Sequence, residues 1–150
     1  MSGVAVSDRD QLVLLRGMQP DPDQIKRILD TAEAAARSMI EVSDLRAAGI
    51  ANDDALLFHV RLLADRGLLE GAYAAKDLGI RPILGGGAVL GGAPLRLTAQ
   101  GHEFAAALRE PKIYERVKTV MAQSGLAVAV QLAGSIATQY AAQRLGLPSG

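Results

Sequence analysis

The residues of this chain best suited to chemistry are its two histidines, His59 and His102. A neutral imidazole can bind a metal ion or serve as a general acid or base, but a metal site needs further ligands at suitable spacing. The chain has no cysteine, and Asp65 lies too far along the sequence from His59 to complete such a site. We predict that both histidines are structural, with His102 buried or half-buried and hydrogen-bonded, and that no metal ion is held.

A glycine-rich run from Gly85 to Gly92 is the other feature with chemical potential, because such loops can cradle phosphate groups. The run lacks the Gly-Lys-Ser/Thr ending of a P-loop and the following helix of a dinucleotide-binding motif. No serine stands in a Gly-x-Ser-x-Gly elbow, and no nucleophile–histidine–acid arrangement is visible. We therefore predict no catalytic residue and no cofactor, and we expect that the protein is not an enzyme.

The composition fits one domain with an appended helical segment. The chain has 150 residues, of which 49% are hydrophobic, with no Trp and two Phe. Alanine, leucine, valine and isoleucine must therefore fill the core, which favours closely packed helices. Sixteen basic residues balance sixteen acidic ones, so no overall charge draws the chain to nucleic acid or to anionic lipid.

The first half of the chain has helical periodicity. Residues 20–23 form a helix start, and apolar residues follow at helical spacing as far as Met39. Residues 40–45 alternate and predict a short strand, or a strand leading into a brief helix capped by Ser43. A helix over 53–66 is expected next, capped by Asn52 or Asp53 and ended by Gly67.

The second half predicts a strand, a long loop, a returning strand and more helices. Strands are expected over 68–74 and 94–98, separated by a glycine-rich loop over 75–93. Thr98 is placed to cap a helix over 99–108. Pro111 opens a further helix that breaks at Ser124 and Gly125, and a last helix covers 127–145.

This order predicts a fold that is mainly α with a small antiparallel β wing: a winged helix-turn-helix plus C-terminal helices. Residues 1–19 are expected to be an N-terminal extension and residues 20–109 the winged-helix domain, with the wing loop at about 75–93. Residues 110–147 form a C-terminal helical segment and a candidate dimerisation element.

Four ordered segments of the chain resemble the domain-of-unknown-function 2513 family of small bacterial and prophage-encoded proteins. They are residues 18–29, 58–71, 96–104 and 112–118, the last followed by Gly125. The second contains Phe-His, Leu-Leu and Gly-Leu, and the third is Arg-Leu-Thr-Ala-Gln-Gly-His-Glu-Phe. The resemblance extends over roughly residues 18–147 and implies a winged-helix fold. The residues before Met18 and the glycine-rich wing depart from the family pattern.

The expected recognition helix and wing supply the candidate contacts to DNA or to another partner. They are Phe58, Arg61, Arg66, Lys76, Arg81 and Arg96. The solvent face of the helix also carries Asp54 and Asp65, which would repel phosphates, and Asp65 lies four residues after Arg61 and compensates part of its charge. An ordinary solvated face explains these charges about as well as DNA recognition does, and Phe58 beside mixed charges also suits a protein interface.

A stripe of mostly small residues follows the last predicted helix and allows close approach of another helix, within the chain or from a second subunit. Its members are Ala129, Ala133, Ala137, Tyr140 and Ala141. We expect a homodimer, although packing within the chain accounts for the stripe equally well.

The expected function is regulator-type binding of duplex DNA through helix 53–66 and the wing. The alternative is a protein-interaction or assembly module, of a prophage or defence system, on a winged-helix scaffold without DNA binding. The longest apolar stretch is too short to span a bilayer, so no membrane partner is expected. The lack of cysteine fits a cytoplasmic protein.

Overall fold

The computed structural model describes residues 18–73 and 78–146. The helices and strands, in chain order, are α2 (Pro22–Ala34), α3 (Val42–Ala47), α4 (Asp54–Asp65), β1 (Leu69–Gly71), β2 (Ile80–Pro82), β3 (Ala88–Leu90), β4 (Leu95–Leu97), α5 (Ala99–Leu108), α6 (Pro111–Ser124) and α7 (Leu126–Arg144). The predicted class, mainly helical with a small antiparallel β region, is confirmed. The predicted N-terminal extension lies almost wholly outside the described residues.

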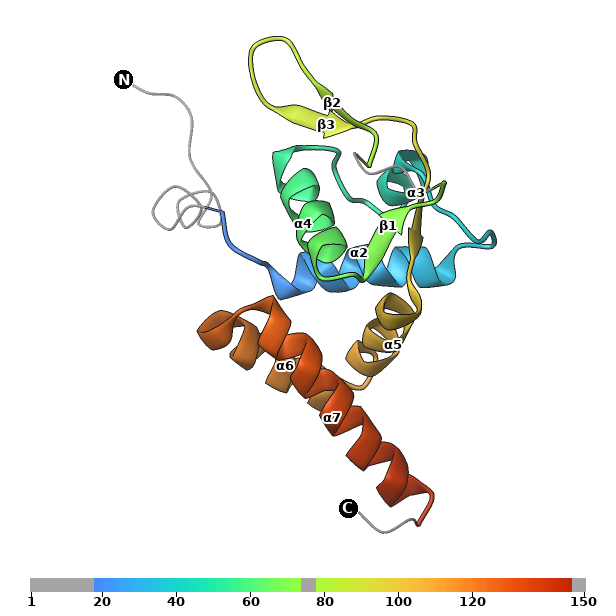
Figure 1. The fold of residues 1–150 in the computed structure, drawn as a ribbon, viewed down its shortest axis with the longest axis vertical. Coiled ribbons are helices and arrows are strands. Elements are labelled where there is room, and N and C mark those ends of the chain that lie inside the picture. Colours follow the sequence, from blue (N-terminus) through green and yellow to red (C-terminus); the bar gives the residue numbers. More distant parts are fainter. Residues whose placement is uncertain (1–17, 74–77, 147–150) are drawn as a thin grey trace.

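Helix α2 runs through the middle of the molecule, with α3, α4 and the strands on one side and α5 to α7 on the other (Figure 1). Asp21 caps its first turn, where the carboxylate accepts the Asp23 N–H at 3.0 Å. The helix ends at Ala34, so the predicted continuation to Met39 was wrong. The chain turns there to bring Ile40 to strand β4, and an ion pair of 2.9 Å between Arg37 and Asp44 spans the turn.

A small antiparallel sheet connects the two halves of the fold. Strand β1 pairs with β4, with Leu69 opposite Leu97 and Gly71 opposite Leu95. Ile40 bridges to Leu95 through two backbone hydrogen bonds of 2.8 Å, which adds one residue beyond β4. The predicted strand at 40–45 is therefore a single bridge followed by helix α3. Ser43 does not cap this helix but lies inside it; the Glu41 N–H donates to the Asp44 carboxylate at 2.7 Å instead.

The segment predicted as a long loop over 75–93 contains a second hairpin. Strands β2 and β3 pair in antiparallel register, with Ile80 opposite Leu90 and Pro82 opposite Ala88. Leu90 is buried, and β3 packs against α4. The loop prediction for residues 80–90 was therefore wrong. The strands are too short, at three residues each, to give a clear signal in the sequence, and β3 is supported by α4, which is distant in sequence.

Apolar residues from these elements form one continuous core, from Ile25 in α2 to Ala133 in α7. Leucine and isoleucine supply most of its large, fully buried side chains. Full burial of each such side chain contributes about 1.5–3 kcal/mol to stability. Leu56, Val60 and Leu63 of α4 are all fully buried, which confirms the predicted stripe of that helix.

Helix α5 approaches the sheet closely because it carries a glycine in its first turn. A Cβ atom on Gly101 would lie 2.0 Å from the backbone oxygen of Leu68. Thr98 fixes the same junction: its hydroxyl donates to the Gly67 carbonyl at 2.6 Å and accepts from the Gly101 N–H at 3.0 Å. The predicted cap at Thr98 and the predicted left-handed helix exit at Gly67, with a φ of 72°, are both confirmed.

Helices α6 and α7 pack along each other below α2, and α7 also contacts α5 (Figure 1). Gly125, with a φ of 88°, makes the break between them. None of the helices in the described part of the chain combines the length and apolar character that crossing a bilayer requires.

Candidate functional site

The N-terminal end of α4 holds the β2–β3 hairpin through one side chain. Asp53 caps α4 by accepting the Leu56 N–H at 2.9 Å. Asn52 makes two bonds to Leu90 in β3: its amide nitrogen donates to the Leu90 carbonyl at 3.0 Å, and its oxygen accepts the Leu90 N–H at 3.1 Å. The hairpin and the helix end are therefore joined over 38 residues of sequence.

The outward face of α4 carries mixed charge, as the helical spacing predicts. Asp54, Arg61 and Asp65 are exposed, and Arg66 is exposed at the end of the helix. Within the described residues, Arg61 and Asp65 do not form the ion pair that their spacing predicts. Phe58 is only half-exposed, and its ring meets the His59 ring edge-on with centroids 5.1 Å apart.

The tip of the β2–β3 hairpin is apolar and bends through three glycines. Gly85, Gly86 and Gly87 all have φ between 83° and 106°, a region that favours glycine. Ile83 is 48% exposed and Leu84 is completely exposed. The hairpin tip, defined here as residues 83–87, therefore presents two aliphatic side chains to solvent.

Two of the three predicted basic residues of the wing are within the described structure. Arg81 is exposed on β2, and its side chain passes over Gly91, where an added Cβ would lie 2.6 Å from the Arg81 Nε. Arg96 pairs with Glu70 directly across the sheet, with an Nε to Oε1 distance of 2.7 Å. Lys76 lies outside the described residues. The charge of Arg96 is therefore largely compensated, whereas Arg81 forms no ion pair within the described part of the chain.

The two histidines have separate structural roles. His59 is 2% exposed; its Nε2 accepts the Asp21 N–H at 2.9 Å, and its Nδ1 donates to the Ala55 carbonyl at 2.7 Å. These bonds require the neutral ring and connect α4 to the start of α2. His102 contacts Glu33 at 2.9 Å but is exposed, so its predicted burial was wrong. Among the described residues, no cluster of three or more potential ligands could hold a metal ion.

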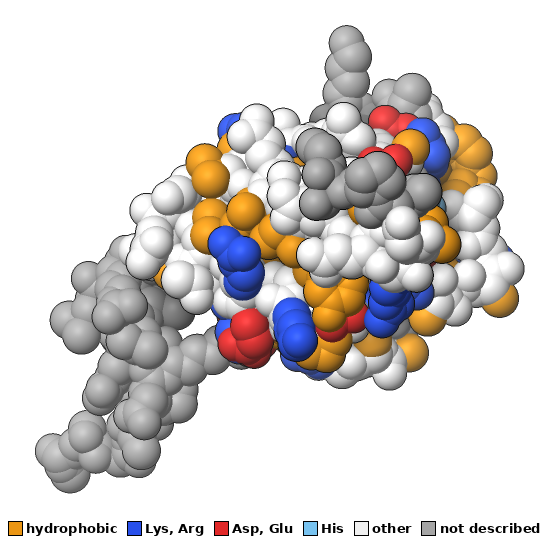
Figure 2. All heavy atoms as spheres, turned by 90° about the horizontal axis from the view of Figure 1, so that it is seen from below, with side chains coloured by type: hydrophobic (Ala, Val, Ile, Leu, Met, Phe, Trp, Pro, Cys, Tyr) orange, Lys and Arg blue, Asp and Glu red, His pale blue; other side chains and the backbone are white. Residues whose placement is uncertain are grey.

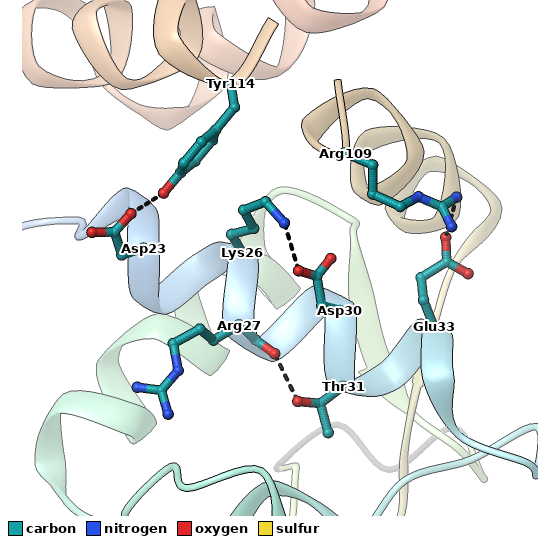
Figure 3. Close-up of polar contacts among 8 residues, drawn as sticks. All are labelled: Asp23, Lys26, Arg27, Asp30, Thr31, Glu33, Arg109 and Tyr114. Atoms are coloured by element: carbon teal, nitrogen blue, oxygen red, sulfur yellow. Dashed lines mark hydrogen bonds and ion pairs between the residues drawn. The ribbon is translucent and has the colours of Figure 1, made fainter. Parts of the chain in front are cut away.

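Side chains on α2 connect it to the C-terminal helices (Figure 3). The Tyr114 hydroxyl of α6 donates to the Asp23 carboxylate. Burial and the adjacent Asp23 raise the pKa of Tyr114 well above its ordinary value. The Tyr114 ring also lies 5.8 Å from the Lys26 ammonium and 5.2 Å from that of Lys118. Further along α2, the Glu33 carboxylate lies 3.5 Å from the guanidinium of Arg109, the residue that follows α5.

The predicted small-residue stripe of α7 divides into two parts. Ala129 and Ala133 are fully buried inside the chain, so packing within the chain explains them. Ala137 and Tyr140 are half-exposed, and Ala141 is exposed. The outer part of the stripe is thus available for contacts that the chain itself does not make.

A comparison with protein-family models matches residues 19–127 to the family described as "Hypothetical protein (DUF2513)". The chain belongs to the DUF2513 family. The match includes α2 to α6 and ends near the start of α7, so it is shorter than the resemblance predicted from the sequence, which extended to residue 147. No curated protein and no solved structure matches the chain.

Sequence reasoning missed the joining of the hairpin to α4. Asn52 was predicted only as an alternative cap, and nothing in its local sequence indicates a bond to Leu90. One signal was present: Asn52 and Asp53 are both suited to capping, and only one of them is needed for that purpose.

Proposed function

We propose that the chain is a winged-helix protein that binds duplex DNA with α4 and the β2–β3 hairpin. The order α2, bridge residue Ile40, α3, α4, β1, hairpin and β4 supports this scaffold. In it, α3 and α4 would be the helix-turn-helix pair, with α4 as the recognition helix. The hairpin would be the wing.

The attachment of the hairpin to the N-terminal end of α4 is the observation that carries this proposal. The major groove of DNA admits either an α-helix or a two-stranded β-ribbon. Here one of each meets at the same end of the molecule, held by the two Asn52–Leu90 hydrogen bonds (Figure 1). Exposed arginines lie on both elements: Arg81 on the hairpin, Arg61 on α4 and Arg66 at the opposite, C-terminal end of α4.

The charge of this surface sets the expected strength of binding. Asp54 and Asp65 are exposed on the same helix and oppose phosphate contacts, and Arg96 is already paired with Glu70. About three phosphate contacts per chain then give a slope of roughly −3 in a plot of log K against log salt concentration. We expect affinity in the range of non-specific binding, with a dissociation constant of about 1–100 µM.

Fluorescence anisotropy of a labelled duplex, measured across a salt series from about 20 to 200 mM, tests the proposal. The variant Arg61→Ala/Arg81→Ala should weaken binding about ten-fold or more and flatten the salt slope by roughly two units. The control is Lys112→Ala/Arg116→Ala, which removes the same two charges from exposed positions on α6. An absence of binding at the lowest salt concentration refutes DNA binding, and so does an equal effect of the control.

A second candidate function is favoured by the apolar hairpin tip. Ile83 and Leu84 lie next to each other and exposed at the hairpin tip, and contiguous exposed apolar side chains mark interaction sites. In a protein-interaction module, Leu84→Ser would abolish complex formation, whereas Arg61→Ala would have little effect. If the chain binds DNA, the arginine substitution has the larger effect on DNA affinity, so the two variants separate the candidates.

A further inference from the structure

The second half of α7, from Gly134 to Arg144, contributes no buried side chain to the core of the chain. The helix has 19 residues, of which only Arg144 is charged, and apolar side chains lie on all its sides. A helix with this composition is normally covered all round. Yet its buried residues, Leu126, Ala129 and Ala133, all lie in its first eight positions, and none from Gly134 to Arg144 is buried.

A hollow of about 1080 Å³ lies beside this half, between α5, the start of α6 and α7. Its walls are mostly apolar, and the side chains that matter here are Phe104, Ala107, Ile113, Val130 and Ala141. Charged residues of both signs also line it, with Glu103 and Glu110 opposed to Arg109 and Arg144. Figure 2 views the molecule from this end and shows apolar side chains gathered between basic and acidic ones.

Gly134 lines the hollow, and the packing of the chain does not explain it. Glycine inside a helix lowers helix stability relative to alanine, so it usually marks a close approach. At Gly101 the neighbour is evident, since an added Cβ would meet the Leu68 backbone at 2.0 Å. At Gly134 an added Cβ would meet no atom within 4 Å. The missing side chain therefore points to a group that a single chain does not supply.

We propose that a second copy of the chain fills this hollow, with the outer half of α7 of each copy lying in the hollow of the other. A projecting helix half beside a hollow on the same chain is self-complementary, as a two-fold interface requires. Helix α7 brings only Arg144 into the contact, where it already lies 3.9 Å from Glu110 of its own chain, and Glu103 of the other copy adds a second acidic group that can face it. No charge is buried without an opposite one. Gly134 allows the two helices to cross closely.

The size of the contact sets the expected affinity. Helix α7 is about 28 Å long. Two such helices crossing along their uncovered sides, with added contacts to α5, would bury on the order of 1,000 Å², near the lower limit of a specific interface. We therefore expect a reversible dimer with a dissociation constant on the order of 10 µM. This association does not depend on whether the protein binds DNA.

Sedimentation velocity of the full chain, from about 1 to 200 µM, tests the proposal by mass alone. The average mass should rise from 15.7 kDa toward twice that value. Thr138→Glu adds a charge in the hollow and should weaken association at least about ten-fold. Its control is Thr119→Glu, the same change at an exposed position of α6 outside the hollow, which should associate as wild type does. Circular dichroism verifies that both variants are folded.

Gly134→Ala gives a second, independent readout. In the monomer at about 1 µM it should raise the melting temperature, because alanine favours the helix and meets no neighbour. In the dimer it should weaken association, because the added methyl group separates the crossing helices. Four outcomes overturn the proposal: a wild-type monomer at the highest concentration, equal effects of the two glutamate variants, a Thr138→Glu variant that associates as wild type does, or an alanine variant that associates as tightly as wild type.

Discussion

Replacing Gly101 by alanine should destabilise the fold, although the substitution places a better helix former in a helix. The added Cβ would lie 2.0 Å from the Leu68 oxygen, 3.0 Å from the Leu68 carbonyl carbon and 3.2 Å from a Leu97 methyl group. Two of these three atoms belong to the backbone and cannot rotate away. Helix α5 must therefore move outward by roughly 1 Å to restore ordinary van der Waals contact.

The magnitude follows from what this movement disturbs. Overpacking of this kind costs about 1–3 kcal/mol. The same movement stretches the 3.1 Å hydrogen bond from the Thr98 N–H to the Leu68 oxygen, which contributes about 1 kcal/mol. The gain in helix propensity offsets at most about 1 kcal/mol. We expect a net loss of about 1–3 kcal/mol in the free energy of unfolding, or roughly a 3–10 °C fall in melting temperature for a chain of this size.

Thermal melting followed by circular dichroism, together with urea unfolding, measures this loss. Gly134→Ala at about 1 µM is the matched control, because it makes the same chemical change in a helix with open space around it and should stabilise the chain by up to about 1 kcal/mol. A Gly101→Ala melting temperature equal to or above that of wild type would refute the steric argument. So would an equal response of the two variants.

Three further substitutions test the other contacts. Replacing His59 by phenylalanine should lower the free energy of unfolding, measured by urea titration, by about 2 kcal/mol, because two hydrogen bonds of a buried ring are lost. The same change at the exposed His102 is the control and should cost less than about 0.5 kcal/mol. The pKa of Tyr114 in the folded state lies above its unfolded value of about 10, so wild type loses stability as the pH rises above about 10. The variant Tyr114→Phe lacks this ionisable group and should therefore lose less stability over the same pH range. A pH series of urea midpoints that is parallel for the two proteins would contradict this. Asn52→Ala should accelerate amide hydrogen exchange across residues 80–90 without changing exchange in α5, and uniform exchange rates would show that the Asn52 bonds do not hold the hairpin.

The elements with strong local signals could be predicted from the sequence. Helix α4 has both a buried stripe and a capping aspartate, and helix α5 follows a capping threonine. These signals lie within a few residues of the structure they specify. The end of α2 at Ala34 could not be predicted in the same way. Its apolar spacing continues to Met39, and the helix stops because Ile40 must reach Leu95, a contact 55 residues away in the sequence.

The sequence predicted which residue types form the candidate site, but not which of their charges are paired with other side chains. Sequence spacing correctly placed Arg61 on the outer face of α4 and predicted a structural role for His59. It did not show that Glu70 lies opposite Arg96, because that pairing depends on the register of two strands separated by a long segment. The charge of Arg96 is therefore already compensated by Glu70, and fewer phosphate contacts are expected than the sequence alone predicts.

Adjacent capping residues at the start of α4 have different roles, and this difference connects the fold to the proposed function. Because Asp53 satisfies the first turn of the helix, the Asn52 amide keeps both a donor and an acceptor for another partner. An amide side chain offers the same pair of groups as a strand backbone, so it can substitute for a missing neighbouring strand along β3. It also fixes the position of Arg81 relative to α4. If α4 and the hairpin act as one surface, the loss of the uncharged Asn52 side chain must weaken DNA binding with little change in the salt slope, whereas the loss of Arg81 must change both. An Asn52→Ala variant with unaltered DNA affinity would mean that helix and hairpin bind independently, or that only one of them contacts DNA.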